Sequence, residues 1–275
     1  MWDDEFDVVC CGSGSGAFAA AIAAADADLD VEVACRPVTP QGTSGSPWLG
    51  RGIEDSETRE YLDELVADQD PSSRDSEHAD IEIRAMRQLS PAAPRTPVET
   101  FHGAQLRDWA GQCLRSPYGL LYTRLTERGG VPMETEAGEI IEANVLGSID
   151  LPAGAGAAAA VDGWMRMQLR ERDIPSDDDA ALERIVFEEG EIVGVALATA
   201  DGPRTVRVRH GIAVSTEVPA AGRRRMETAQ TLRVALVGRS ASRFSRVELL
   251  TIPSAGHPDD LAQGNGAPHS HARRS

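Results

Sequence analysis

The chain has 275 residues, of which 41% are hydrophobic, so it can bury a sizeable core. Its formal net charge is −17 at pH 7, and all 27 basic residues are arginines. Because an acidic surface disfavours a polyanion, we expect no nucleic acid partner. The acidic start MWDDEFD and the lack of a long apolar run predict a cytoplasmic protein without a transmembrane segment.

The first patterned stretch is FDVVCCGSGSGAFAAAIAAADADLDVEVACRP, residues 6–37. Its apolar beginning, residues 6–11, predicts a buried parallel strand. An alanine-rich helix is expected over residues 15–27, and the alternation over residues 31–35 predicts a second strand. Together these elements make a βαβ unit of about 30 residues, the length that a dinucleotide-binding unit requires.

The turn inside this unit has the spacing G-x-G-x-x-A, formed by Gly12, Gly14 and Ala17. Gly12 permits a tight turn from strand to helix, and Gly14 lets a pyrophosphate approach the backbone. Ala17 is small enough for the helix to sit against the strand. The N–H groups at the helix start favour a phosphate, so the motif indicates a dinucleotide site.

The remaining elements follow in chain order. We expect a loop at 37–52, a helix starting at Asp55 or Ser56, and a short helix at 81–89. A packed helix is expected within 101–125, where Trp109, Tyr118 and Tyr122 most simply belong to the core. Further elements are a helix at 153–174, a three-stranded meander at 182–217, two strands near 231–238 and 244–252, and a disordered tail at 254–275.

The cysteines and histidines indicate no metal site. Cys10, Cys11, Cys35 and Cys113 have neither zinc-ligand nor disulfide-framework spacing, and the six histidines are scattered. Cys10 and Cys11 lie in an apolar run, so we expect them to act as small buried hydrophobic residues.

With these segments in order, the chain resembles the FAD-binding flavoproteins of the fumarate reductase and 3-ketosteroid dehydrogenase group. The resemblance rests on the N-terminal unit, on GIEDSETREYLDELV, and on the segment from VDGWMRMQL through the meander to GIAVSTE. It implies an α/β, Rossmann-like fold of the glutathione-reductase type, with residues 6–11 central, residues 31–35 beside them and the meander at the edge. The substrate cap domain would be reduced or absent.

The resemblance also implies a domain organisation and a site. One FAD-binding-like domain would span 1–253, split into halves 1–66 and 152–253 around a variable middle segment, 67–151. FAD would lie across the glycine turn, beside the end of the second strand and along the following loop. The candidate cofactor-binding residues are Gly12, Ser13, Gly14, Ser15, Gly16, Ala17, Cys35, Arg36, Gly42, Thr43 and Ser44.

Several positions depart from the family pattern. Cys35, followed by Arg36, stands where the family has an acid that binds the adenosine ribose, and a thiol is a poor acceptor. Gln41 replaces the first glycine of the flavin loop, and Ser215-Thr216-Glu217-Val218 replaces Ala-Thr-Gly-Gly. Asp28 and Asp173 stand at helix ends where the family has glycine, so both are expected in the left-handed conformation.

Three functions remain open at this point. The first is a flavin-dependent oxidoreductase acting on a CH–CH bond of a steroid-like or other apolar substrate, with a partner subunit or a second copy completing the site. The second is a non-catalytic structural or regulatory subunit that binds no flavin. The third is an NAD(P)-dependent reductase using Arg36, although a chain without lysine has no Tyr-x-x-x-Lys pair.

Overall fold

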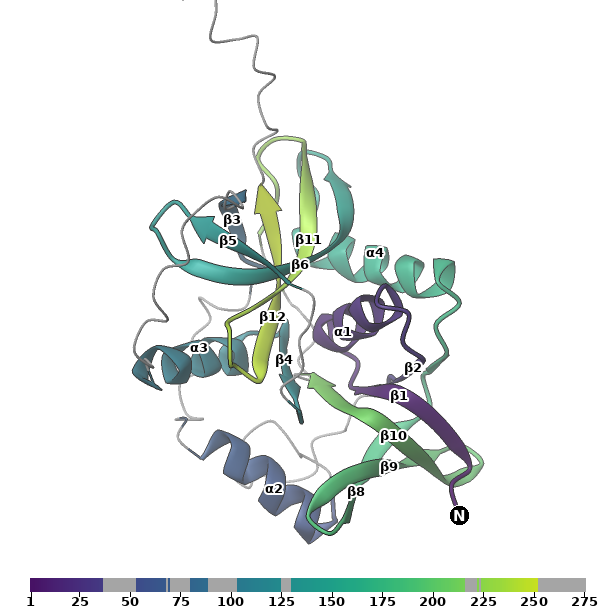
Figure 1. The fold of residues 1–275 in the computed structure, drawn as a ribbon. Helices are drawn as coiled ribbons and strands as arrows, with labels where there is room; N and C mark the ends of the chain where they lie inside the picture. The colour runs from purple at the N-terminus through teal and green to yellow at the C-terminus, as the bar shows by residue number, and fades with distance from the viewer. Residues whose placement is uncertain are drawn as a thin grey trace, which may run out of the picture.

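The computed structural model describes residues 1–36, 53–67, 69, 80–88, 103–124, 130–215, 222 and 224–251. The loop expected at 37–52 and the tail expected at 254–275 lie outside the described residues. Figure 1 shows a mixed α/β fold, in which a βαβ unit begins the chain and a second group of strands curls beside it.

The predicted βαβ start is confirmed. Strand β1 (Asp4–Cys11) is followed by helix α1 (Ser15–Ala25) and by strand β2 (Val31–Ala34), which pairs with β1 in parallel. Asp28, just beyond α1, has a φ of 58°, and Asp173, just beyond helix α4 (Ala157–Glu171), has a φ of 52°. Both aspartates therefore adopt the left-handed conformation expected of them, which is usually reserved for glycine.

The three-stranded meander is also confirmed, but its expected place at the edge is wrong for its last strand, which lies inside the sheet and pairs directly with β1. It consists of β8 (Ala181–Glu188), β9 (Glu191–Thr199) and β10 (Gly202–Ser215). The far half of β10 runs parallel to β1, with Cys11 opposite Val214. Two short strands complete this part of the sheet: β7 (Ser176–Asp177) beside β2, and β4 (Gly119–Tyr122) antiparallel to β10.

The second group of strands closes into a ring, which we call the barrel. Its strands are β3 (Ile83–Gln88), β5 (Val131–Thr135), β6 (Ile140–Leu151), β11 (Gln230–Gly238) and β12 (Phe244–Thr251). Each pairs with the next in that order, and β12 returns to pair with β3. The two strands expected near 231–238 and 244–252 are thus present.

The short helix expected at 81–89 is wrong, because residues 83–88 form the strand β3. Ile81 and Ile83 already alternate with charged residues, which suits a strand. Pairing with β12 on one side and β5 on the other outweighs the helical propensity of the segment.

Four helices cover the described strands. Besides α1 they are α2 (Ser56–Val66), α3 (Gly103–Arg115) and α4 (Ala157–Glu171). Of the two capping residues that the sequence offers, Asp55 and Ser56, Asp55 caps α2, since its carboxylate accepts the Thr58 N–H at 2.9 Å. No helix in the described ranges is long and apolar enough to cross a membrane.

Alternate residues of β11 and β12 face two different hydrophobic clusters. Ala235, Val237 and Leu250 belong to the cluster that fills the barrel and continues under α2 and α3. Val234, Leu236, Val247 and Leu249 belong to the cluster that surrounds α1 and α4. Helix α1 is consequently buried on nearly all sides, and its alanines allow the close packing that this position requires.

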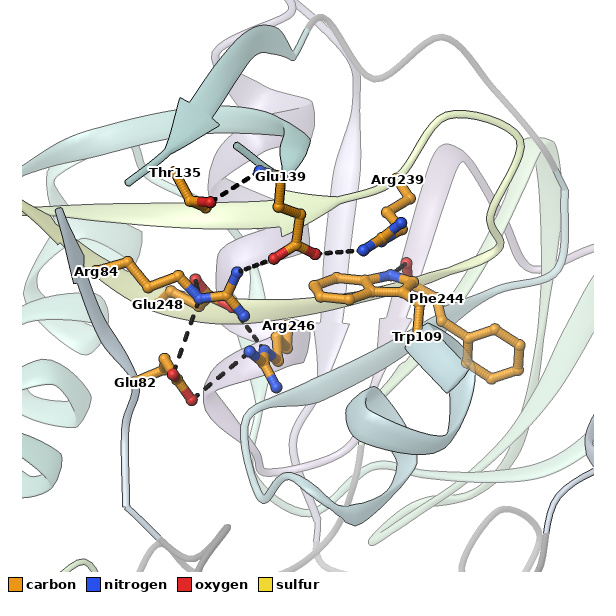
Figure 2. Close-up of polar contacts among 9 residues, drawn as sticks. All are labelled: Glu82, Arg84, Trp109, Thr135, Glu139, Arg239, Phe244, Arg246 and Glu248. Carbon is orange, nitrogen blue, oxygen red and sulfur yellow. Dashed lines mark hydrogen bonds and ion pairs between the residues drawn. The ribbon is translucent and has the colours of Figure 1, made fainter. Parts of the chain in front are cut away.

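A group of charged residues, which we call the arginine cluster, lies at one end of the barrel (Figure 2). Its three arginines are Arg84, Arg239 and Arg246, and its three glutamates are Glu82, Glu139 and Glu248. Every member has an opposite charge within 4.0 Å. The cluster carries no net formal charge, which favours a structural role.

Helix α3 closes over the arginine cluster through Trp109. The indole is 1% exposed and donates its N–H to the carbonyl of Phe244 at 3.0 Å. The guanidinium carbons of Arg246 and Arg239 lie 5.1 and 5.7 Å from the ring centroid, within cation–π range. Trp109, like the buried Tyr118, therefore has the core role that the sequence favoured.

Candidate functional site

The glycine turn lies where the carboxyl ends of β1, β2 and β10 meet. Gly12 follows β1 directly, and its N–H donates to the carbonyl of Ala34 in β2 at 2.9 Å. Its φ is +116°, a conformation that residues with a Cβ rarely adopt. Ligands of parallel α/β sheets bind outside the carboxyl ends of the strands, so this edge is the expected place for a site.

The start of α1 carries no side-chain cap. Gly14 is the N-cap residue, with φ −82° and ψ 156°, and it has no side chain to accept a hydrogen bond from the first turn. The first turn also contains no acidic residue. The partial positive charge at this helix end is therefore not offset by a carboxylate of the helix itself, which is the arrangement that suits an anion.

Gly16 sets how closely α1 approaches β4. A Cβ at Gly16 would lie 2.5 Å from the carbonyl oxygen of Gly119 and 3.3 Å from the Cβ of Leu120. The sequence reasoning gave the close-packing role to Ala17, which is indeed fully buried. The structure adds Gly16, whose missing Cβ allows α1 to lie close to the backbone of β4 at Gly119.

Ser215, the last residue of β10, lies directly against the turn. A Cβ on Gly12 would overlap the Ser215 hydroxyl oxygen, so this oxygen occupies the space left by the missing side chain. Ser215 is 2% exposed, and among the described residues its Oγ has no hydrogen-bond partner. The site therefore contains a buried hydroxyl that the described protein groups do not satisfy.

Cys35 and Arg36 follow β2 at the same edge of the sheet. Their backbone N–H groups donate to the carbonyls of Asp177 and Ala180, both at 2.8 Å, which holds the end of β2 against the segment after β7. Burial, followed by the negative charge of Asp178, raises the pKa of Cys35 to about 12. Cys35 is thus a neutral thiol near pH 7 and no substitute for a carboxylate acceptor.

The structure brings most of the predicted site residues together. Gly12, Gly14, Ser15, Gly16 and Ala17 are buried in the turn and the first turn of α1, and Ser13 is half-buried. The thiol of Cys35 is buried, whereas Arg36 is exposed. Gly42, Thr43 and Ser44, with Gln41, Thr216, Glu217 and Val218, lie outside the described residues.

No group of metal-ligating side chains occurs within the described ranges. All four cysteines are buried and none forms a disulfide, and the burial of Cys10 and Cys11 was expected. The site is defined by backbone groups, the hydroxyls of Ser13, Ser15 and Ser215, and the thiol of Cys35.

No family model matches the sequence, and no curated protein matches it. Among solved structures, the chain resembles 3-ketosteroid Δ4-(5α)-dehydrogenase from Rhodococcus jostii, with 17% identity and a TM-score of 0.32 over 77% of this chain. It also resembles 3-ketosteroid Δ1-dehydrogenase from Sterolibacterium denitrificans, with 15% identity and a TM-score of 0.33 over 76% of this chain. A third similar structure is a myxobacterial chondrochloren halogenase of the FAD-dependent type, with 13% identity and a TM-score of 0.30 over 75% of this chain.

The chain covers 46%, 47% and 36% of the lengths of these three proteins. At such identities and TM-scores the likeness is a distant, partial resemblance in fold to FAD-dependent oxidoreductases. The chemistry of this chain therefore has to be argued from its own residues.

Two features of the site were not assigned from sequence. Ser215 was noted only as a departure from a family motif, because nothing in the sequence shows that its hydroxyl meets Gly12. The contact between Gly16 and Gly119 was also not anticipated. The only available signal was the third glycine in GSGSG, which is typical of close backbone approach.

Proposed function

We propose that this chain binds FAD and forms the dinucleotide-binding part of a flavin-dependent oxidoreductase. The observation that carries the proposal is the glycine turn, which places an uncapped helix start at the carboxyl edge of β1, β2 and β10. A helix start of this kind favours the doubly charged pyrophosphate of a dinucleotide.

Different residues of the site would contact different parts of FAD. In this proposal, Gly12 to Ala17 hold the pyrophosphate through backbone N–H groups, while the end of β2, at Cys35 and Arg36, faces the adenosine. Gly42, Thr43 and Ser44 would contact the flavin side, as the family resemblance implies. The turn fits the phosphates, and Cys35 is the poorest fit because its thiol is a weak acceptor.

When bound, the flavin would supply hydride transfer to or from a carbon–carbon bond. The substrate would be steroid-like or otherwise apolar, and a partner subunit or a second copy of the chain would complete the catalytic site. The site residues described here act only in binding and orientation, since none of them is positioned as an acid or a base.

A second candidate function is a structural or regulatory subunit that binds no flavin. The observation that favours it is Cys35, whose pKa of about 12 keeps the thiol protonated. Losing a hydrogen bond to a charged group costs roughly 1.5–3 kcal/mol, which corresponds to about one to two orders of magnitude in affinity.

A binding experiment separates the two functions. FAD is titrated into the purified full chain while flavin fluorescence is recorded, and ADP and FMN are then added as competitors. We expect weak but saturable FAD binding that ADP displaces and FMN does not, because the turn would hold the half shared with ADP. Absence of saturable binding would favour the flavin-free subunit.

Cys35→Glu sharpens this experiment. If the adenosine lies beside β2, the new carboxylate should tighten FAD binding by roughly 10-fold or more, since it restores charge-assisted hydrogen bonds to the ribose. Glu183→Gln, on the exposed face of β8, removes one carboxylate elsewhere and serves as the charge control. An unchanged affinity in a folded Cys35→Glu protein would place the adenosine away from β2.

A further inference from the structure

We infer that the Ser215 hydroxyl is a ligand-binding group that donates a hydrogen bond to a phosphate oxygen at the start of α1. The inference rests on the proposed dinucleotide site and adds a binding residue to it. In the resembling family this position is an alanine, so the hydroxyl is a feature of this chain.

The Ser215 hydroxyl lies beside the glycine turn that leads into helix α1. Ser215 pairs with Leu120 of β4, and Leu120 in turn lies against Gly16 in the first turn of α1. On its other side, the Ser215 Oγ lies against Gly12, two residues before the N-cap Gly14. The hydroxyl therefore lies against the residue that begins the turn, and β4, which pairs with the end of β10, lies against the first turn of the helix.

The chemistry of the hydroxyl points to a missing partner. A buried polar group without a hydrogen bond is destabilising, and most buried side-chain polar atoms in proteins have a partner. Ser242, which is equally enclosed at 4% exposed, shows the usual outcome, because its Oγ accepts the Phe244 N–H at 3.1 Å. Ser215 has no such contact among the described residues.

An anion satisfies this group better than a neutral ligand would. The helix start favours negative charge, and a hydroxyl can donate to a phosphate oxygen while backbone N–H groups donate to others. The Ser215 hydroxyl and the backbone N–H groups would then bind one phosphate together. The hydroxyl would add a contact to a site in which Cys35 and Gln41 depart from the family pattern.

The test compares Ser215→Ala with the wild-type chain and with Ser242→Ala. Each protein is titrated with FAD and, separately, with inorganic pyrophosphate by calorimetry, and its melting temperature is measured without ligand. Ser215→Ala should weaken binding of FAD by roughly 10- to 100-fold, the effect of one hydrogen bond to a charged group. Its ligand-free melting temperature should stay equal or rise, because an unsatisfied hydroxyl is removed.

Ser242→Ala should behave in the opposite way, with a lower melting temperature and unchanged FAD affinity. If wild type binds FAD and Ser215→Ala binds it equally well, the inference fails while the proposed function stands. If wild type binds neither FAD nor pyrophosphate, both fail. A Ser215→Ala protein that melts well below wild type would also overturn the inference, since the hydroxyl would then have a structural partner.

Discussion

The arginine cluster and the glycine turn both bury polar atoms, but they do so differently. In the arginine cluster, three arginines face three glutamates, and Glu248, which is fully buried, has Arg84 and Arg246 within 3.1 Å. At the glycine turn, the buried Ser215 hydroxyl has no hydrogen-bond partner among the described residues, and the helix start has no side-chain cap.

The difference separates a structural role from a binding role. Ion pairs join β3 to β12, and Trp109 of α3 packs against Arg239 and Arg246. Glu248 Oε2 and Arg239 Nε make no hydrogen bond among the described residues, but both side chains face opposite charges within the protein. The glycine turn keeps backbone and hydroxyl groups unsatisfied at an edge where α/β proteins bind their ligands. Substitutions that break ion pairs in the arginine cluster should change the stability of the protein. Substitutions that fill the space at the glycine turn should change its affinity for a ligand.

The largest expected effect comes from breaking the arginine cluster. Glu248→Gln should lower the free energy of unfolding by about 3–5 kcal/mol, since it removes the buried carboxylate shared by the buried Arg246 and the half-buried Arg84. Urea unfolding at pH 7 measures the effect. Glu134→Gln is the matched control, because its partner Arg87 is 70% exposed, and the loss there should be at most about 1 kcal/mol. Equal losses in both variants would contradict a structural role specific to the buried cluster.

A smaller effect is expected where α1 meets β4. Gly16→Ala should destabilise the protein by roughly 1–3 kcal/mol, because the new Cβ would lie 2.5 Å from the Gly119 carbonyl oxygen. Gly163→Ala in α4 is the matched control, since a Cβ there meets nothing within 4 Å. That control should stabilise the protein by roughly 0.5–1 kcal/mol. A Gly16→Ala protein as stable as the control would show that helix and strand do not approach so closely.

The smallest effect is expected at the start of α2. The side chain of Asp55 caps this helix, whereas no side chain caps α1. Asp55 accepts hydrogen bonds from the Thr58 hydroxyl and backbone N–H, and these bonds lower the pKa of Asp55 below its ordinary 3.8. Because the folded-state pKa is depressed, the stabilisation is complete above the unfolded pKa and disappears as the pH falls through the folded value.

Asp55→Ala should therefore cost about 0.5–2 kcal/mol at pH 7 and less at pH 2.5, as measured by urea unfolding at both values. Asp55→Asn keeps a capping oxygen, so it should recover most of the loss and remove this contribution to the pH dependence. An Asp55→Ala penalty that is the same at both pH values would contradict the assigned cause.

The sequence predicted the parts of the fold whose signals are local. The apolar run of β1, the period-2 pattern of β2, the glycine turn and the turn residues of the meander led to the βαβ unit and to β8–β10. The segment DSET indicated the start of α2, with Asp55 or Ser56 as its cap. Left-handed conformations at Asp28 and Asp173 were also predicted, since each aspartate stands at a helix end where a glycine was expected.

The barrel was not predicted, because its pairings are long-range. β3 pairs with β12, and β11 with β6, across about 80 residues of chain or more in each case. Arg84, Arg246 and Glu248 are charged, so a sequence pattern assigns them to the surface, and only the closed ring of strands brings them together inside. The same limit applies to Ser215, whose neighbour Gly12 lies some 200 residues away in the chain.

The most direct test of the glycine turn as the dinucleotide site is the FAD affinity of Gly14→Val, measured by calorimetry beside wild type. Gly14 has φ −82° and ψ 156°, an extended conformation open to valine, so the variant should fold with a similar melting temperature. We predict at least a 10-fold loss of FAD affinity, because a valine side chain would occupy the space that the phosphate needs. Wild-type affinity in a folded Gly14→Val protein would contradict the assignment of the site to the glycine turn.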